Sequence, residues 1–125
     1  MTKISSGLKT LFLVHFIFGL VFGLAYLLIP GLFMGWFGML VKDDLPYRMA
    51  GAAVLAFSAS SWFAYQAAEW ERVKIVVQAE IVWTVLAALV GLYGILFAKQ
   101  PAAEWTNVII MAGFAAAFIY YFSKK

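Results

Sequence analysis

The sequence predicts an all-α membrane protein, an antiparallel up-down-up-down bundle of four spanning helices. Hydrophobic residues make up 66% of the 125 residues and charged residues 12%, against roughly 45–50% and about 25% in soluble domains. A soluble chain this short could not bury so much apolar surface. Four segments are also long enough to cross ~30 Å of hydrocarbon as helices. These predicted spans are about residues 7–29, 46–68, 73–98 and 102–123.

Helices are expected in these segments because every backbone polar group in lipid must find a partner within the structure. None of the segments alternates as the strands of a membrane barrel do. The first is longer than the apolar core of a signal peptide and has no small-residue cleavage site, so we expect it to be retained. Short turns at 69–72 and 99–101 make successive helices adjacent and antiparallel. Residues 1–125 should therefore form a single transmembrane domain.

Residues 31–41, GLFMGWFGMLV, are apolar but too short to span the membrane. Three glycines and Trp36 favour an interfacial segment on the outer side, because tryptophan is enriched at the headgroup level. Two interpretations stay open. The segment is either a loop against the headgroups or a lid over a cavity between helices.

The distribution of basic residues predicts the orientation. In a four-span chain both termini and the 69–72 turn share one side, which carries six of the nine Lys and Arg residues. The positive-inside rule places that side in the cytoplasm. We therefore expect a multi-pass protein of the cell (inner) membrane with cytoplasmic N- and C-termini. The inner set is Lys3, Lys9, Arg72, Lys74, Lys124 and Lys125, and the outer set is Lys42, Arg48 and Lys99.

Small residues at four-residue spacing predict how the helices pack, because lipid gives apolar side chains little reason to associate and close backbone approach matters more. We expect packing within the bundle, with a homo-oligomer through the same faces as the alternative. Large residues such as Phe12 would then partly face lipid. The small-residue sets are Ala52, Ala56, Ser60, Ala64 and Ala68; Gly19 and Gly23; Ala87 and Gly91; Ala112 and Ala116; Gly113 and Ala117.

Polar side chains inside predicted spans are the candidate functional residues, because they are costly in lipid. His15 lies six residues after Lys9, and Glu80 lies six residues after Lys74. Both spans start from the same side, so both groups should lie ~9 Å beyond those lysines. We expect a buried polar layer that exchanges protons or binds a cationic ligand. The alternatives are a bond that fixes helix register, or a Glu80 that reaches cytoplasmic water. The predicted layer is His15, Ser60, Ser61, Gln78 and Glu80.

A second polar cluster is expected at the outer end. Arg48 begins the second span and Glu104 begins the fourth, so an ion pair between them would join those ends. Asp43 and Asp44 are the alternative partners of Arg48. Exposed pairs contribute only ~0–1 kcal/mol, so simple interfacial pairing is the expected role.

Several classes of function are not expected. The chain has no cysteine, which excludes thiolate chemistry, and a single histidine, which excludes the common zinc sites. Phosphate-binding loops and recognised catalytic motifs are absent from the sequence, and no basic run suggests nucleic-acid binding. We therefore expect a non-enzymatic protein with no cofactor, no metal and no nucleic-acid partner.

The segment Tyr47-Arg48-Met49-Ala50-Gly51 resembles DoxX-like and related small four-helix membrane proteins. The resemblance implies that plan for the whole chain and no agreed activity. We expect a membrane module that binds a lipid-like or apolar ligand, or a membrane partner. The alternative is a proton-linked transporter of a small substrate that uses Glu80 and His15.

Overall fold

The computed structural model describes residues 2–124. These residues form helices only, apart from an isolated bridge between Lys3 and Glu69. The all-α prediction is therefore confirmed. The helices are α1 (Ser6–Leu28), α2 (Pro30–Gly35), α3 (Leu45–Ala67), α4 (Trp70–Phe97) and α5 (Glu104–Ser123).

Three helices, α1, α4 and α5, are long and apolar enough to cross a membrane. Helix α3 has the same length as α1, 23 residues, but is not one of the three membrane-spanning candidates. It carries Arg48 near its start and Ser58, Ser60 and Ser61 in its second half. By length and composition, the chain is thus a membrane protein with three spanning candidates, and α3 is the more polar fourth long helix.

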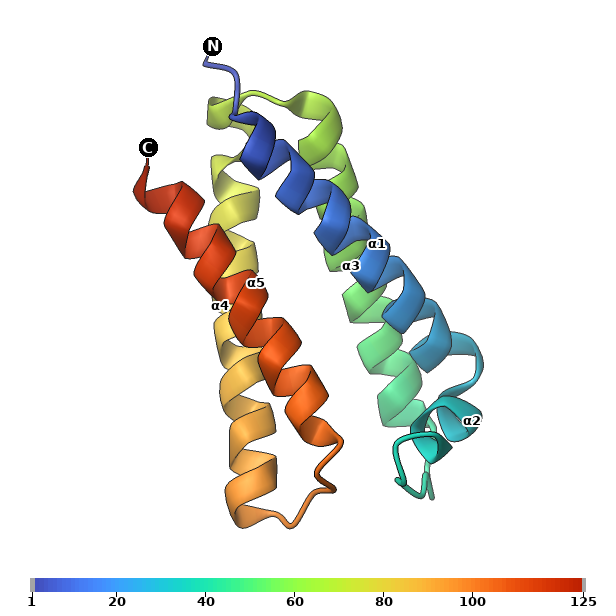
Figure 1. Ribbon diagram of the computed structural model, residues 1–125. Coiled ribbons are helices and arrows are strands. Elements are labelled where there is room, and N and C mark those ends of the chain that lie inside the picture. The colour runs from blue at the N-terminus through green and yellow to red at the C-terminus, as the bar shows by residue number, and fades with distance from the viewer. Residues whose placement is uncertain (1, 125) are drawn as a thin grey trace.

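The long helices lie as two hairpins (Figure 1), with α1 closest to α3 and α4 closest to α5. Both ends of the chain and the α3–α4 turn lie at one end of the molecule, here called the terminal end. The α4–α5 loop and α2 lie at the other, here called the open end. Each hairpin is thus a pair of neighbouring helices that run in opposite directions.

The core that joins the two hairpins sits toward the terminal end. It draws side chains from all four long helices, and Phe12, Val73, Val77 and Phe118 are fully buried. The expectation that Phe12 partly faces lipid was wrong, because its ring packs against Phe118 with centroids 5.9 Å apart. The core residues are Leu8, Phe12, Ala64, Val73, Val77, Phe114 and Phe118.

Glycines bring α1 and α3 into close contact. A Cβ atom on Gly51 would lie 2.7 Å from the Leu27 nitrogen and 2.9 Å from the Gly23 carbonyl oxygen. A Cβ on Gly19 would lie 2.7 Å from Cβ of Ser58. Backbone contact this close is possible only without side chains at these positions.

The predicted small-residue stripe from Ala52 to Ala68 is not the contact face of α3. Ala52 and Ala56 are exposed, and the buried residues are Gly51, Ser58, Ser61 and Ala64. A helix turns once every 3.6 residues, so a strict four-residue repeat rotates steadily around it. Such a stripe cannot stay on one face over five positions. Ala112, Gly113 and Ala116 of α5 are exposed as well.

Backbone hydrogen bonds close the terminal end. The Ile4 amide donates to the Ala68 carbonyl at 3.0 Å, and the Trp70 amide donates to the Thr2 carbonyl at 2.7 Å. The tail before α1 is therefore bonded to the α3–α4 turn. Ala68 turns the chain there with a left-handed φ of 55°.

The predicted interfacial segment, 31–41, includes most of the short helix α2. Pro30 begins α2, where its missing N–H leaves no helical bond unmade. Phe33 and Met34 are buried, whereas Trp36 and Leu40 are 66% and 81% exposed. The segment thus turns one side inward and holds large apolar side chains outward, as a headgroup-level segment would.

Candidate functional site

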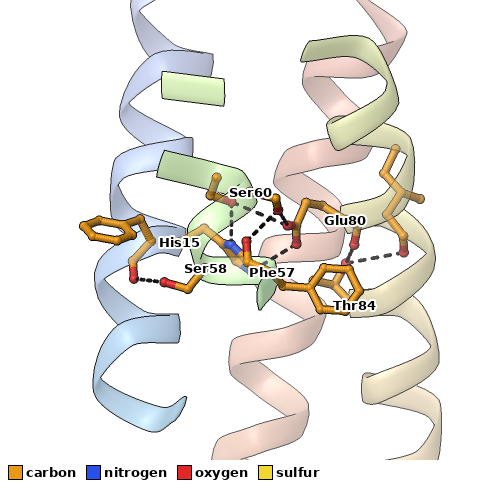
Figure 2. Close-up of polar contacts among 9 residues, drawn as sticks. His15, Phe57, Ser58, Ser60, Glu80 and Thr84 are labelled. Carbon is orange, nitrogen blue, oxygen red and sulfur yellow. Dashed lines mark hydrogen bonds and ion pairs between the residues drawn. The ribbon is translucent and has the colours of Figure 1, made fainter. Parts of the chain in front are cut away.

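Four predicted residues meet in the interior of the bundle (Figure 2). His15 comes from α1, Ser60 and Ser61 from α3, and Glu80 from α4. His15 Nδ1 lies 2.8 Å from Ser61 Oγ, in a hydrogen bond whose donor depends on the histidine tautomer. His15 Nε2 lies 3.2 Å from Glu80 Oε2, and Ser60 Oγ donates to Glu80 Oε1 at 3.1 Å. These four residues are called the polar layer below.

The two ionisable residues of the polar layer are buried. Glu80 is 0% exposed and His15 is 4% exposed. The edges of Phe114 and Phe118 of α5 pack against the imidazole, with centroids 4.8 and 5.5 Å away. The alternative that Glu80 reaches cytoplasmic water is therefore wrong, because apolar rings and the other helices cover this depth of the bundle.

Two buried hydroxyls near the polar layer donate hydrogen bonds to main-chain carbonyl oxygens. Ser58 Oγ donates to the Phe16 carbonyl oxygen at 2.6 Å, across the α1–α3 contact. Thr84 Oγ1 donates to the Glu80 carbonyl oxygen at 2.6 Å, one turn back along α4. Both hydroxyls are buried and satisfied, so α3 and α4 place polar residues here without leaving these hydroxyls unpaired.

One carboxyl oxygen in the layer lacks a hydrogen bond. Glu80 Oε2 is buried and has no hydrogen-bond partner among the described residues, although His15 Nε2 is only 3.2 Å away. The two atoms are therefore within ion-pair distance, although no hydrogen bond joins them. The carboxyl and the imidazole are thus in direct contact in the interior of the bundle.

Gln78 does not belong to the layer. It is exposed on α4, whereas Glu80 two residues later is fully buried. Two residues turn a helix by more than half a revolution, so residues two apart point to opposite sides. The prediction for Gln78 was wrong because it considered only how far along α4 the residue lies and not which face of the helix carries it.

The predicted ion pair between Arg48 and Glu104 is not formed. Arg48 pairs with Asp44 at 3.1 Å, the alternative partner, and donates from Nη1 to the Leu27 carbonyl at 2.6 Å. Glu104 instead accepts a hydrogen bond from Asn107 Nδ2 at 3.0 Å. The two residues begin helices of different hairpins, and each finds a partner within its own hairpin.

A cavity of about 660 Å³ lies between the hairpins, mostly toward the open end. Its walls are mainly apolar and aromatic, with residues from all five helices and the adjoining loops. His15 is the part of the polar layer that borders it, so the layer forms one end of the cavity. Met34, Phe37 and Met39, in and just after α2, contribute to its wall at the open end. Part of segment 31–41 therefore lines the cavity wall.

Polar groups are few in the cavity wall, and most lie near the open end. Glu104 and Asn107 of α5 are joined there by Gln100 of the preceding loop and by Tyr26 and Tyr47. The rings of Tyr26 and Tyr47 are stacked, with centroids 6.4 Å apart. Sequence reasoning placed Glu104 at a helix start but did not find this group, because no pattern in the sequence signals a space between two hairpins.

Within residues 2–124, no three His, Asp or Glu side chains gather closely enough to hold a metal ion. No family model matches the chain, and no curated protein or solved structure shows significant similarity to it. Function must therefore be inferred from the polar layer and the cavity.

Proposed function

We propose that this protein is a non-enzymatic membrane module that binds a lipid-like or apolar ligand in the cavity between its hairpins. The observation that carries the proposal is a cavity of about 660 Å³ lined chiefly by aromatic and aliphatic side chains. Ligand sites are typically concave, largely apolar and about this size, with a few polar groups that fix orientation. A membrane partner protein bound beside the bundle is a weaker alternative.

The proposal includes a topology. All four long helices span the cell membrane as an up-down-up-down bundle, with both termini in the cytoplasm. Helix α3 is less apolar than the others, but the hydroxyls of Ser58, Ser60 and Ser61 all have partners inside the bundle. These three hydroxyls therefore do not present unpaired polar groups to lipid. A reporter active only in the cytoplasm should work when fused after Lys125 and fail when fused within the 99–101 turn; activity at both places would contradict the topology.

The exposed residues Ala52 and Ala56 of α3 and Ala112 and Ala116 of α5 leave room for a homo-oligomer, as a secondary part of the proposal. Membership of the DoxX-like group also belongs to the proposal. It adds no activity to that inferred from the cavity.

Photolabelling tests the binding proposal. The protein is placed in lipid nanodiscs, exposed to a hexadecanol carrying a diazirine, irradiated and digested for mass spectrometry. Label should concentrate on cavity residues. An Ala87→Phe substitution fills the cavity and should reduce that label about tenfold, whereas Ala112→Phe on the exposed face of α5 should not. Label spread evenly over lipid-facing residues, or unchanged by Ala87→Phe, would refute binding in the cavity.

A proton-linked carrier is the second candidate, favoured by the buried contact between His15 and Glu80 at the closed end of the cavity. Ionisable groups inside a membrane commonly mark proton or substrate pathways. Proteoliposomes loaded with a pH-sensitive dye and given a pH gradient should then conduct protons, and Glu80→Gln should abolish the flux. Equal flux in wild type, Glu80→Gln and empty liposomes would leave the layer with a structural role alone.

A further inference from the structure

The cavity wall carries one acidic side chain and no lysine or arginine among the described residues. Glu104 is the only Asp, Glu, Lys or Arg among the described residues that line it. No Lys, Arg or His of residues 2–124 lies within ion-pair distance of this carboxylate, whose hydrogen bond comes from the neutral amide of Asn107. Arg48 at the same end pairs with Asp44. The cavity therefore holds a half-buried acid with no charge to balance it.

Aromatic rings line the same cavity as this acid. Tyr26 and Tyr47 belong to its wall, and their rings stack with centroids 6.4 Å apart. Tyr93 lines the cavity from α4. Aromatic faces attract cations within about 6 Å of the ring, and quaternary ammonium groups are bound in this way. A carboxylate that shares a cavity with tyrosines suits a positively charged group better than a neutral or negative one.

The rest of the cavity suits an alkyl chain. Phe114, which packs on His15, follows Glu104 by ten residues of α5, an axial distance of about 15 Å. Between them the walls are formed by side chains such as Phe22, Val54 and Ile110. An extended dodecyl chain has a comparable length. An anionic headgroup at the open end would be repelled by Glu104, so the charge and the walls together select one class of amphiphile.

We propose that the cavity binds a cationic amphiphile, with its ammonium headgroup beside Glu104 and its alkyl chain directed toward the polar layer. This inference rests on the proposed binding function and names the chemical class of its ligand. Glu104 and the tyrosines recognise the headgroup, and the apolar walls accept the tail. His15 and Glu80 lie beyond the end of the tail and do not contact the headgroup.

Competition between matched amphiphiles tests the inference. Dodecyltrimethylammonium and dodecanol carry the same alkyl chain and differ in headgroup charge. Each is titrated against the diazirine-bearing hexadecanol on wild-type protein in nanodiscs of zwitterionic lipid. The cation should compete about tenfold more tightly than the alcohol, as a partly exposed ion pair and a cation–π contact acting together would allow.

Two variants locate the effect. Glu104→Gln keeps the size of the side chain and a partner for Asn107, and it should remove the cation's advantage over dodecanol. Asp43→Asn changes charge equally at the same end of the molecule, outside the cavity, and should leave the advantage intact. Displacement of the label from the cavity of Glu104→Gln by dodecanol shows that this variant is folded.

The two proposals fail in different ways. If dodecanol competes and the cation competes no better, or if Glu104→Gln keeps the preference, the cationic ligand is refuted and apolar binding stands. If Asp43→Asn loses the preference as fully as Glu104→Gln does, general surface charge explains it and the site is refuted. If neither amphiphile displaces the label from the cavity, the proposed function itself is refuted.

Discussion

Replacing Gly51 with alanine should destabilise the α1–α3 hairpin, although alanine is the better helix former. The new Cβ would lie 2.7 Å from the Leu27 nitrogen and 2.9 Å from the Gly23 carbonyl oxygen. Both atoms belong to the backbone of α1, so no side-chain rotation relieves the overlap. The nitrogen must move to at least 3.4 Å for ordinary contact, which requires α1 to shift as a body.

The magnitude follows from two opposing effects. Overpacking a close contact costs about 1–3 kcal/mol. Replacing glycine by alanine inside a helix returns about 1 kcal/mol. We therefore expect a net loss of up to about 2 kcal/mol for Gly51→Ala. A Cβ atom on Gly113 of α5 would have no neighbouring atom within 4 Å. Gly113→Ala should therefore gain only the stability of about 1 kcal/mol that alanine's higher helix propensity provides.

Equilibrium unfolding in mixed micelles, followed by circular dichroism, measures both variants against wild type. The expected order of stability is Gly113→Ala, then wild type, then Gly51→Ala. The two alanine variants should differ by about 1–3 kcal/mol. A Gly51→Ala protein as stable as Gly113→Ala would refute the close approach of the two helices.

Three further pairs of substitutions test the polar contacts, each by the same unfolding measurement. Glu80→Gln can still accept a hydrogen bond from Ser60 and should cost about 1 kcal/mol, whereas Glu80→Leu removes the contacts with both Ser60 and His15 and should cost about 1–3 kcal/mol more; equal costs would contradict the buried layer. Ser58→Ala should cost about 0.5–1.5 kcal/mol through its lost bond to α1, and Ser123→Ala, at an exposed site, should be near neutral. Arg48→Met should be more destabilising than Asp44→Asn, because Arg48 also bonds a carbonyl at the end of α1 while the ion pair itself is exposed; the reverse order would show that the pair matters more.

Much of the fold could be predicted because the bilayer imposes a strong rule on sequence. Apolar runs of about twenty residues, separated by short polar turns, locate the long helices to within a few residues. The meeting of His15 and Glu80 could also be anticipated, since counting residues from a shared membrane surface gives depth and the neighbouring small residues give the face.

Other features depend on how the helices pack, which composition does not record. Gln78 has the right depth but the wrong face. Arg48 takes the acid one turn away, because a local partner needs no contact between hairpins. The cavity could not be predicted at all. It lies where the two hairpins separate, and the sequence of a single helix does not indicate that separation.

The bonded, tightly packed terminal end has a consequence for any molecule that enters the cavity. If the helices span the bilayer as proposed, the space between the hairpins is accessible from one leaflet, and the layer around Phe12 and Phe118 blocks the way to the other. A guest would leave by the route it entered. Passage across the membrane would require the fully buried rings of Phe12 and Phe118 to separate. The architecture by itself therefore favours a receptor or store for a membrane solute over a conduit.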